Sequence, residues 1–472
     1  MNNNKLGLWL LTALVVGNMV GSGIFMLPQS LAKAASPAGV FLAWGLTGFG
    51  VLMLSLVFGN LSTRKPELNG GVQMYAKAIF PQGSRAGVMS GYVVSWGYWI
   101  ANVAGNVAIL TTFIGYLSTF FPIMTSSAEL FTIGSFTVKV GGLLTFIICT
   151  IVLWVMNAII LRGIERTGQI NFVATATKVL GFLIFIGFTL FAFEKTNLLP
   201  LVQPRTGDSG AHLGLLGQVN NAAVTTLWAF IGIESAVMFS KRAKTLSDIK
   251  KATVLGLAIS LVIYVGITLL VMGSLTQSEL MHADKPLVDA LQKVVGHKVS
   301  YVMAVFDLIS LTGTTIGWIF LSAEAPYQAA KQGLFPPIFR KENKNGVPAA
   351  SLVITNAFSQ LFLFLTISDS LSNAFNFVVQ VATLAYLVPY AATAIYQVKM
   401  VLSGDTYMTG KGRFTDGIIS VLATVYSLYV IISGTSNMKT FLLGVGLYML
   451  GIILFPLLMR SKESLPENQK AA

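Results

Sequence analysis

Twelve apolar stretches, each long enough to cross a lipid bilayer, occupy most of this 472-residue chain. A membrane-spanning helix needs about 20 predominantly apolar residues. Because 54% of the residues are hydrophobic and only 10% are charged, little of the chain is left for a separate soluble domain. The sequence therefore predicts an all-α integral membrane protein with 12 transmembrane helices. The expected spans are residues 7–33, 38–62, 86–119, 138–161, 165–193, 213–240, 250–275, 297–331, 348–367, 371–400, 416–434 and 437–459.

The basic residues divide unequally between the loops expected on the two sides of the membrane. The N-terminus, the even-numbered loops and the C-terminal tail hold 22 Lys and Arg residues, whereas the odd-numbered loops hold eight. Cytoplasmic loops of membrane proteins carry the excess of Lys and Arg, so both termini are expected in the cytoplasm. The same bias accounts for the formal charge of +13 without a nucleic-acid partner.

Cysteine and histidine are too few and too scattered to suggest a metal site or a disulfide. Cys149 is the one cysteine, and His212, His282 and His297 fall in or near loops on one side of the membrane. The sequence contains no Walker motif, no repeated pore-lining motif and no nucleophile beside a base. We therefore expect no metal and no cofactor, and we expect neither an enzyme nor a channel.

Four charged residues lie in the interior of the expected spans, away from their ends: Lys178, Glu234, Asp307 and Glu324. Such residues are costly in a bilayer and are functional-site candidates by default. For Lys178 the alternative is a side chain that extends to the membrane surface, although it lies more than two turns from the nearest expected end of its span. For the three acidic residues the alternative is a structural pair with a buried base.

The first expected span is interrupted by the segment GNMVGSGIFMLPQ at residues 17–29. Its glycines predict two half-helices joined by an unwound stretch at Gly21, Ser22 and Gly23. Unwound backbone within a membrane is tolerated where it lines a cavity, and its free N–H groups can hold a carboxylate. The alternative is a helix-packing face, because Gly17 and Gly21 form a GxxxG pattern.

A second interruption lies in the sixth expected span, where TLWAFIGIESA places Gly232 close to Glu234. The first span opens one set of five helices and the sixth opens the next set, so the two interruptions occupy corresponding places. Paired interruptions of this kind mark the substrate site of transporters built from inverted repeats. The sequence therefore favours a secondary transporter.

Several segments in order resemble the amino acid, polyamine and organocation transporter superfamily. Within it, the chain is most similar to the basic amino acid/polyamine antiporters, and among these to the bacterial arginine/ornithine antiporters. The resemblance implies a leucine-transporter-like fold, with inverted repeats at about 7–193 and 213–400, two further helices within 401–460 and a cytoplasmic tail at 461–472. The matching segments are GNMVGSGIFMLP (17–28), GGVQMYAKAIF (70–80), YWIANVAGNVAI (98–109), LRGIERTGQIN (161–171), TLWAFIGIESA (226–236), GWIFLSAEAPYQAAKQGLFPPIF (317–339), KENKNGVPA (341–349) and LVPY (387–390).

The resemblance also implies a substrate site. The first break would bind the substrate carboxylate, backbone carbonyls of the second break would bind the amino group, and the cationic side chain would lie between Trp318 and Asn106. Core packing for the tryptophans and a helix-to-helix hydrogen bond for Asn106 remain the structural alternatives. The implied contact residues are Gly21, Ser22, Gly23, Ala101, Asn102, Asn106, Trp228, Ala229, Ile231 and Trp318.

The same resemblance implies residues for gating and coupling. Glu234 corresponds to a glutamate linked to proton sensitivity, and Tyr98 and Tyr390 correspond to gate tyrosines. Lys178 resembles a lysine whose ammonium occupies the ion site of sodium-coupled relatives, so sodium coupling is not expected.

Asp307 and Glu324 are further candidates for coupling. Asp307 precedes Trp318 by eleven residues, close to three helical turns, so both project from nearly the same face. We hypothesise that Asp307 attracts cations on the outer side of the site. The role of Glu324 is left open between coupling and a structural pair.

Together these features predict an amino acid antiporter of the bacterial cell membrane that exchanges arginine or lysine for ornithine or another amine. Ala229, Ala382 and Asn102 replace two serines and a cysteine of the arginine/agmatine relatives, so the substrate pair stays open. Alternatives are exchange of an amino acid for its decarboxylation product (tyrosine/tyramine, histidine/histamine), agmatine/putrescine exchange, and proton-coupled symport or uniport. Membrane lipid is an expected partner, and the sequence leaves open whether the protein is a monomer or a homodimer.

Overall fold

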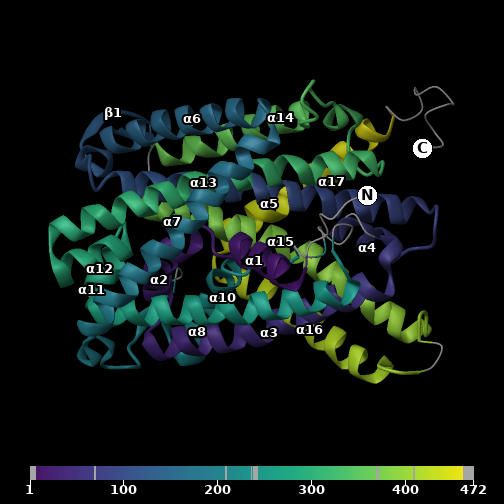
Figure 1. The fold of residues 1–472 in the computed structure, drawn as a ribbon, viewed down its shortest axis with the longest axis horizontal. Helices are drawn as coiled ribbons and strands as arrows, with labels where there is room; N and C mark the ends of the chain where they lie inside the picture. Colours follow the sequence, from purple (N-terminus) through teal and green to yellow (C-terminus); the bar gives the residue numbers. More distant parts are fainter. Residues whose placement is uncertain are drawn as a thin grey trace.

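Long helices run roughly side by side along the longest axis of the molecule (Figure 1). The computed structural model describes residues 7–68, 71–134, 136–207, 210–234, 237, 243–367, 371–407 and 410–460. The long helices are α3 (Pro37–Arg64), α5 (Arg85–Leu117), α6 (Val140–Leu161), α7 (Ile164–Phe191), α10 (Leu246–Ser274), α13 (His297–Lys331), α14 (Ala349–Leu363), α15 (Leu371–Ser403), α16 (Arg413–Ser433) and α17 (Met438–Arg460).

Shorter elements flank or interrupt these helices. The short α-helices are α1 (Leu8–Met19), α2 (Gly23–Ala34), α4 (Val72–Ala78), α8 (Leu215–Trp228), α11 (Gln277–His282) and α12 (Pro286–Val295). The 3-10 helices are η1 (Pro66–Leu68), η2 (Pro122–Thr125), η3 (Lys195–Leu198), η5 (Pro337–Arg340), η6 (Phe364–Thr366) and η7 (Gly434–Ser436). Two small antiparallel strand pairs join β1 (Glu129–Ile133) to β2 (Phe136–Lys139) and β3 (Arg205–Thr206) to β4 (His212–Leu213).

The length and composition of the helices show a multi-pass membrane protein. Within the described residues, nine helices are long and apolar enough to cross a membrane, and the bent pair α1 and α2 makes a tenth if it counts as one span. The stretches 165–193 and 213–240 were also expected to span. They contain α7, whose apolar portion covers Thr177–Phe191, and α8, which has 14 residues. The total of 12 spans therefore stays a prediction.

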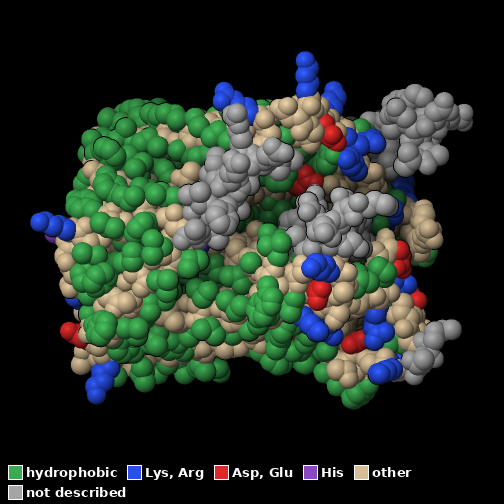
Figure 2. Space-filling model, viewed as in Figure 1, with side chains coloured by type: hydrophobic (Ala, Val, Ile, Leu, Met, Phe, Trp, Pro, Cys, Tyr) green, Lys and Arg blue, Asp and Glu red, His purple; other side chains and the backbone are tan. Residues whose placement is uncertain are grey.

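Two contacts mark opposite ends of the molecule. At one end, Arg64, the last residue of α3, forms an ion pair with Asp416 in the first turn of α16, with Nε and Oδ2 2.9 Å apart. At the other end, Arg205 of β3 donates to the carbonyl of Ala32 in the last turn of α2. On the face shown in Figure 2, Lys and Arg side chains gather mainly at the end where α4 and α16 lie, and hydrophobic side chains cover the middle.

The core is centred on α5 and α15, which are buried along most of their length. Small residues on α5 allow this close packing. A Cβ atom on Gly97, for example, would overlap the ring of Tyr448 of α17, whose hydroxyl donates to the Ala385 carbonyl of α15. This packing holds α5 against α17 and α15.

Candidate functional site

The first predicted break is present between α1 and α2, whose axes meet at 49°. Residues 20–22 interrupt the helix, and side chains from other helices bind the carbonyl groups left at the end of α1. The hydroxyl of Tyr264 donates to the Met19 carbonyl at 2.6 Å, and Nζ of Lys178 donates to the Val20 carbonyl at 2.6 Å. These two bonds satisfy backbone groups that lipid cannot satisfy.

Lys178 links this break to α13. Its side chain is buried, and its Nζ also donates to Oγ1 of Thr314 at 3.2 Å. The ammonium therefore lies at the interrupted backbone rather than at either end of α7. A role of Lys178 in coupling stays a prediction.

The glycines of the first break leave room for two indole rings. A Cβ atom on Gly21 would lie 3.5 Å from Nε1 of Trp318, and a Cβ atom on Gly23 would lie 3.4 Å from Nε1 of Trp228. Any longer side chain would displace the rings. Gly23 is the first residue of α2, so the unwound stretch is residues 20–22 and begins one residue earlier than predicted.

The second predicted break follows α8, which ends at Trp228. Residues from there to Glu234 form turns, and Gly232 has a φ of +102°. Residues other than glycine rarely adopt this backbone conformation. A Cβ atom on Gly232 would also lie 3.3 Å from the backbone carbonyl of Asn18. Glycine at 232 thus allows the turn and its close approach to the first span.

Glu234 joins the second break to α5 and α15 through three hydrogen bonds. Its Oε1 accepts from the hydroxyl of Tyr98 at 2.6 Å. Its Oε2 accepts from the hydroxyl of Tyr390 at 2.6 Å and from the backbone N–H of Gly232 at 3.2 Å. All three side chains are buried, so the structure brings the three predicted gating residues into one cluster.

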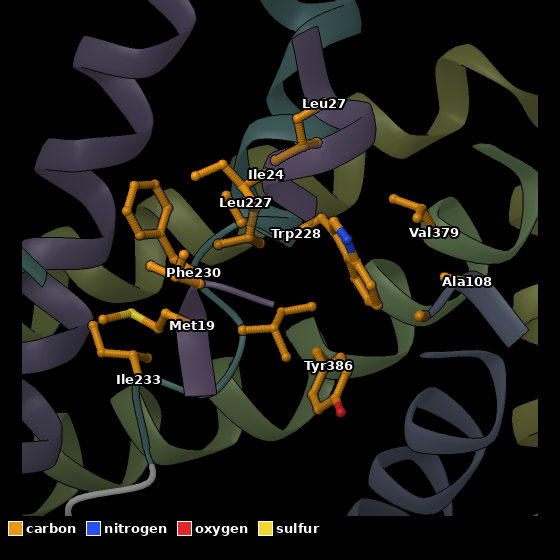
Figure 3. Packing of buried hydrophobic residues seen from close by; sticks show 14 of the residues in the cluster. Met19, Ile24, Leu27, Ala108, Leu227, Trp228, Phe230, Ile233, Val379 and Tyr386 are labelled. Atoms are coloured by element: carbon orange, nitrogen blue, oxygen red, sulfur yellow. The ribbon is translucent and has the colours of Figure 1, made fainter. Parts of the chain in front are cut away.

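A small cavity lies where the two breaks meet, and its free space of about 20 Å³ is enough for about one water molecule. Figure 3 shows the indole of Trp228 extending between Leu27 of α2, Ala108 of α5 and Val379 of α15. Six predicted contact residues line the cavity: Gly21, Ser22, Gly23, Trp228, Ile231 and Trp318. Met19, Ile109 and Tyr264 also line it; the sequence analysis did not identify them, because they are ordinary apolar and aromatic residues of spans.

A second small cavity, with about 20 Å³ of free space, borders the Glu234 cluster. The turn after α8 reaches the first cavity with Trp228 and Ile231 and the second with Glu234. The cluster of Glu234 with Tyr98 therefore lies at the border of the two cavities. The second cavity is lined by Phe58, Gly71, Val72, Gln73, Tyr75, Tyr98, Glu234, Val237, Ala325 and Gln328.

Four predicted contact residues lie outside the lining of the first cavity. Ala101, Asn102, Asn106 and Ala229 are fully buried and do not line it. Nδ2 of Asn102 donates to the carbonyl of Tyr98, and Nδ2 of Asn106 donates to Oγ of Ser322. Asn106 thus makes the helix-to-helix bond that was considered as the structural alternative, and its carbonyl oxygen is still available.

Asp307 and Glu324 lie apart from the tryptophan-lined cavity. Asp307 is buried, and its Oδ2 has no hydrogen-bond partner among the described residues. Glu324 is half-buried and accepts a hydrogen bond from Gln328, which lines the second cavity. Their predicted roles in attracting cations and in coupling stay predictions.

Comparison with known proteins identifies the family. A family model described as amino acid permease matches residues 6–455. The chain belongs to the amino acid permease family. This permease is 50% identical over 453 residues to the "Putative arginine/ornithine antiporter" of Bacillus subtilis, and the match covers 96% of each chain. It is 38% identical over 462 residues to the arginine/ornithine antiporter of Pseudomonas aeruginosa, covering 96% of this permease and 91% of that protein.

A more distant relative is named for a different exchange. The permease is 34% identical over 460 residues to the arginine/agmatine antiporter of Chlamydia felis, covering 95% of this chain and 88% of that protein. The family resemblance expected from the sequence motifs is confirmed by these matches.

Proposed function

We propose that the protein is a cationic amino acid antiporter that exchanges arginine or lysine for ornithine or a related amine by alternating access. The observation that carries the proposal is the meeting of two interrupted helices at one cavity with two tryptophans in its wall. Relatives that match nearly the whole chain are named as arginine/ornithine and arginine/agmatine antiporters. Both findings support a transport protein rather than an enzyme.

The residues around the cavity suit the three parts of a cationic amino acid in their chemistry. The N-terminus of α2, at Ser22 and Gly23, offers N–H groups to the carboxylate. Backbone carbonyls after Trp228 are available to the amino group. The cationic side chain would lie against the indole of Trp318, a cation–π contact worth roughly 0.5–2 kcal/mol depending on desolvation, with Asn106 at its end.

The Glu234 cluster would act as a gate. Tyr98, Tyr390 and Glu234 bridge α5, α15 and the second break, so opening the path between the two cavities requires that these hydrogen bonds break or move. Lys178 places its own positive charge on the carbonyl of Val20, which supports transport without sodium.

The wider architecture is part of the same proposal. We expect 12 helices, of which residues 7–193 and 213–400 form inverted repeats in a transport core over 1–400, followed by two helices in 401–460 and a tail at 461–472. The gathering of Lys and Arg at one end supports cytoplasmic termini in a bacterial cell membrane.

Exchange in proteoliposomes tests the proposal directly. Uptake of labelled arginine should require ornithine inside the vesicles, and Trp318→Ala should reduce arginine affinity about tenfold. Vesicles without internal substrate that accumulate arginine under a pH gradient would instead indicate proton-coupled transport. Faster exchange of tyrosine for tyramine, histidine for histamine or agmatine for putrescine would replace the proposed substrate pair.

A further inference from the structure

An open groove runs along the beginning of α16, away from both cavities described above. It has about 660 Å³ of free space, whereas the cavity between the two breaks has about 20 Å³. Its residues on α16 recur every three or four positions and therefore form one face of the helix. That face consists of Phe414, Gly417, Ile418, Val421 and Leu422.

The groove is apolar and opens toward the membrane. α16 is one of the candidate spans, and Phe414 on the groove face is 81% exposed. The floor is low at Gly417, because an added Cβ there would already lie 3.3 Å from Cγ1 of Val401 on α15. An exposed apolar surface on a spanning helix contacts lipid in a membrane, so the groove is shaped to hold a hydrocarbon chain.

Arg413 is the one charged residue in the lining, and contacts with α15 fix its position. Its Nε donates to the carbonyl of Val401 at 2.8 Å, and its Nη2 donates to the carbonyl of Leu402 at 3.0 Å. The guanidinium packs against Gly404, where φ is +74° and a Cβ atom would lie 3.4 Å from Nη1. Nη1 has no hydrogen-bond partner and no carboxylate within ion-pair distance among the described residues. It is therefore free to bind an anion at the end of the groove.

Lys411 adds a second positive charge two residues before Arg413. Its backbone carbonyl accepts from Nη2 of Arg64 at 3.4 Å, and Arg64 forms the ion pair with buried Asp416. These contacts anchor the turn before α16 to α3. The side chain of Lys411 is exposed and makes no ion pair in the part of the chain that the structure describes. Two cations without an acidic partner thus lie at one end of an apolar groove.

We propose that this groove binds an anionic phospholipid, with an acyl chain along α16 and the phosphate on Nη1 of Arg413 and Nζ of Lys411. Lipid tails elsewhere in the bilayer are as apolar as the groove, so burial of the chain does not decide which lipid binds. The charge of the headgroup decides it, since arginine pairs its N–H groups with phosphate oxygens. Each basic residue favours an anionic lipid by about fivefold. The site lies at the end where Lys and Arg gather, which is the end proposed to face the cytoplasm (Figure 2).

The test measures contact with lipid beside the groove in full-length protein held in phosphatidylcholine nanodiscs. A bimane fluorophore is attached to Val425→Cys in a Cys149→Ser background, and the quencher is phosphatidylglycerol or phosphatidylcholine with a nitroxide on its acyl chain. Val425 lies one turn beyond Val421, so the probe senses the groove without filling it. Half-quenching should require at least about fivefold less nitroxide phosphatidylglycerol than nitroxide phosphatidylcholine.

Leu361→Cys on α14 provides a matched control position. Val425 and Leu361 are each the thirteenth residue of their helix, they are 57% and 60% exposed, and both helices begin at the same end of the molecule. The two nitroxide lipids should quench a probe at Leu361 equally.

Substitutions of the basic residues test the headgroup contact. Arg413→Gln and Lys411→Gln should each raise the phosphatidylglycerol needed for half-quenching at Val425 by about fivefold. Lys411→Gln removes no side-chain contact within the described residues, so it remains informative if Arg413→Gln fails to fold. Lys344→Gln removes an exposed charge from the same end and should leave quenching unchanged.

Several results would overturn the proposal. Equal quenching of the Val425 probe by both lipids would do so, as would a preference for phosphatidylglycerol that survives both glutamine substitutions. An equal preference at Leu361 would show only a general attraction of anionic lipid to the basic end. A Val425 probe that neither lipid quenches would show that another molecule, such as a second copy of the chain, covers the groove. Transport plays no part in these measurements, so their failure would leave the proposed antiport function untouched.

Discussion

At the residue scale, Lys178 shows how a single charged side chain can stabilise an interrupted helix. Its Nζ contacts the carbonyl of Val20 and the hydroxyl of Thr314, which are oxygen ligands of the kind that a sodium ion also binds. A tethered ammonium supplies the positive charge without an ion from solution. We therefore expect transport that does not depend on sodium.

Lys178→Met should slow arginine/ornithine exchange at least tenfold, because methionine fills similar space but leaves the Val20 carbonyl without a donor. A buried acceptor left unpaired costs about 1–3 kcal/mol, so the melting temperature should also fall. Replacing sodium with choline should leave the wild-type exchange rate unchanged. A wild-type rate that rises with sodium would contradict the role assigned to the lysine.

The sequence indicated single candidate residues but not the residues that contact them. The sequence analysis singled out Lys178 and Glu234 because a charge within an apolar stretch is conspicuous. It could not name Thr314, Ser322 or Ser359, since their contacts join residues 136 to 253 positions apart. Serine and threonine inside spans commonly bind their own helix, and nothing in their local sequence distinguishes these three.

At the scale of elements, the break after α8 depends on the backbone conformation of Gly232. Gly232→Ala should destabilise the protein by about 1–3 kcal/mol, because φ at this position is +102° and the added Cβ would approach the backbone of Asn18. Gly266→Ala, within α10, is the control: no atom lies within 4 Å of the added Cβ, so the variant should be neutral or stabilised by up to about 1 kcal/mol. Thermal unfolding in detergent distinguishes the two, and equal melting temperatures would contradict the strained turn.

The short helix α12, which is not among the candidate spans, introduces a dependence of stability on pH. Burial raises the pKa of Asp289 to about 6, although neighbouring Lys285 opposes the shift. An unfolded aspartate titrates near 4, so the folded state binds the proton more tightly. The resulting stabilisation is complete below about pH 4 and is lost as the pH rises through about 6.

Asp289→Asn should remove this dependence. The melting temperature of the wild type, relative to that of the variant, should fall between pH 4 and pH 7 by an amount that corresponds to roughly 2 kcal/mol. Comparing the two proteins at each pH cancels the contribution of other titrating groups. Parallel curves would show that Asp289 titrates normally in the folded protein.

The start of a helix was predicted correctly where a glycine precedes it. The expected span 297–331 coincides with α13, which begins after Gly296 at a φ of +80°. The strand pairs were missed because β1 and β2 are five and four residues long and join two apolar stretches. The expected span 213–240 extends beyond the end of α8 at Trp228, because apolar residues continue after the helix ends.

At the scale of the whole molecule, the unequal distribution of basic residues predicts which end faces the cytoplasm. Lys344 and His282 are exposed and belong to loops expected on opposite sides. In a Cys149→Ser background, a membrane-impermeant thiol reagent added to intact cells should label His282→Cys but not Lys344→Cys. Permeabilised cells should show labelling of both, and the reverse pattern in intact cells would invert the proposed orientation.

Oδ1 of Asn102 and Oδ1 of Asn106 on α5 are buried without a hydrogen-bond partner among the described residues. These oxygens suggest why the transporter would change conformation slowly when no substrate is bound. A substrate that ends in N–H groups would pair with these oxygens, whereas an empty transporter keeps them buried without a partner among the described residues. At about 1–3 kcal/mol for each oxygen, and with about 1.4 kcal/mol for each factor of ten in rate, the unloaded transit would be slower by roughly one to four orders of magnitude. One-for-one exchange of substrates would then follow from these unpaired hydrogen-bond acceptors, without a separate gating element.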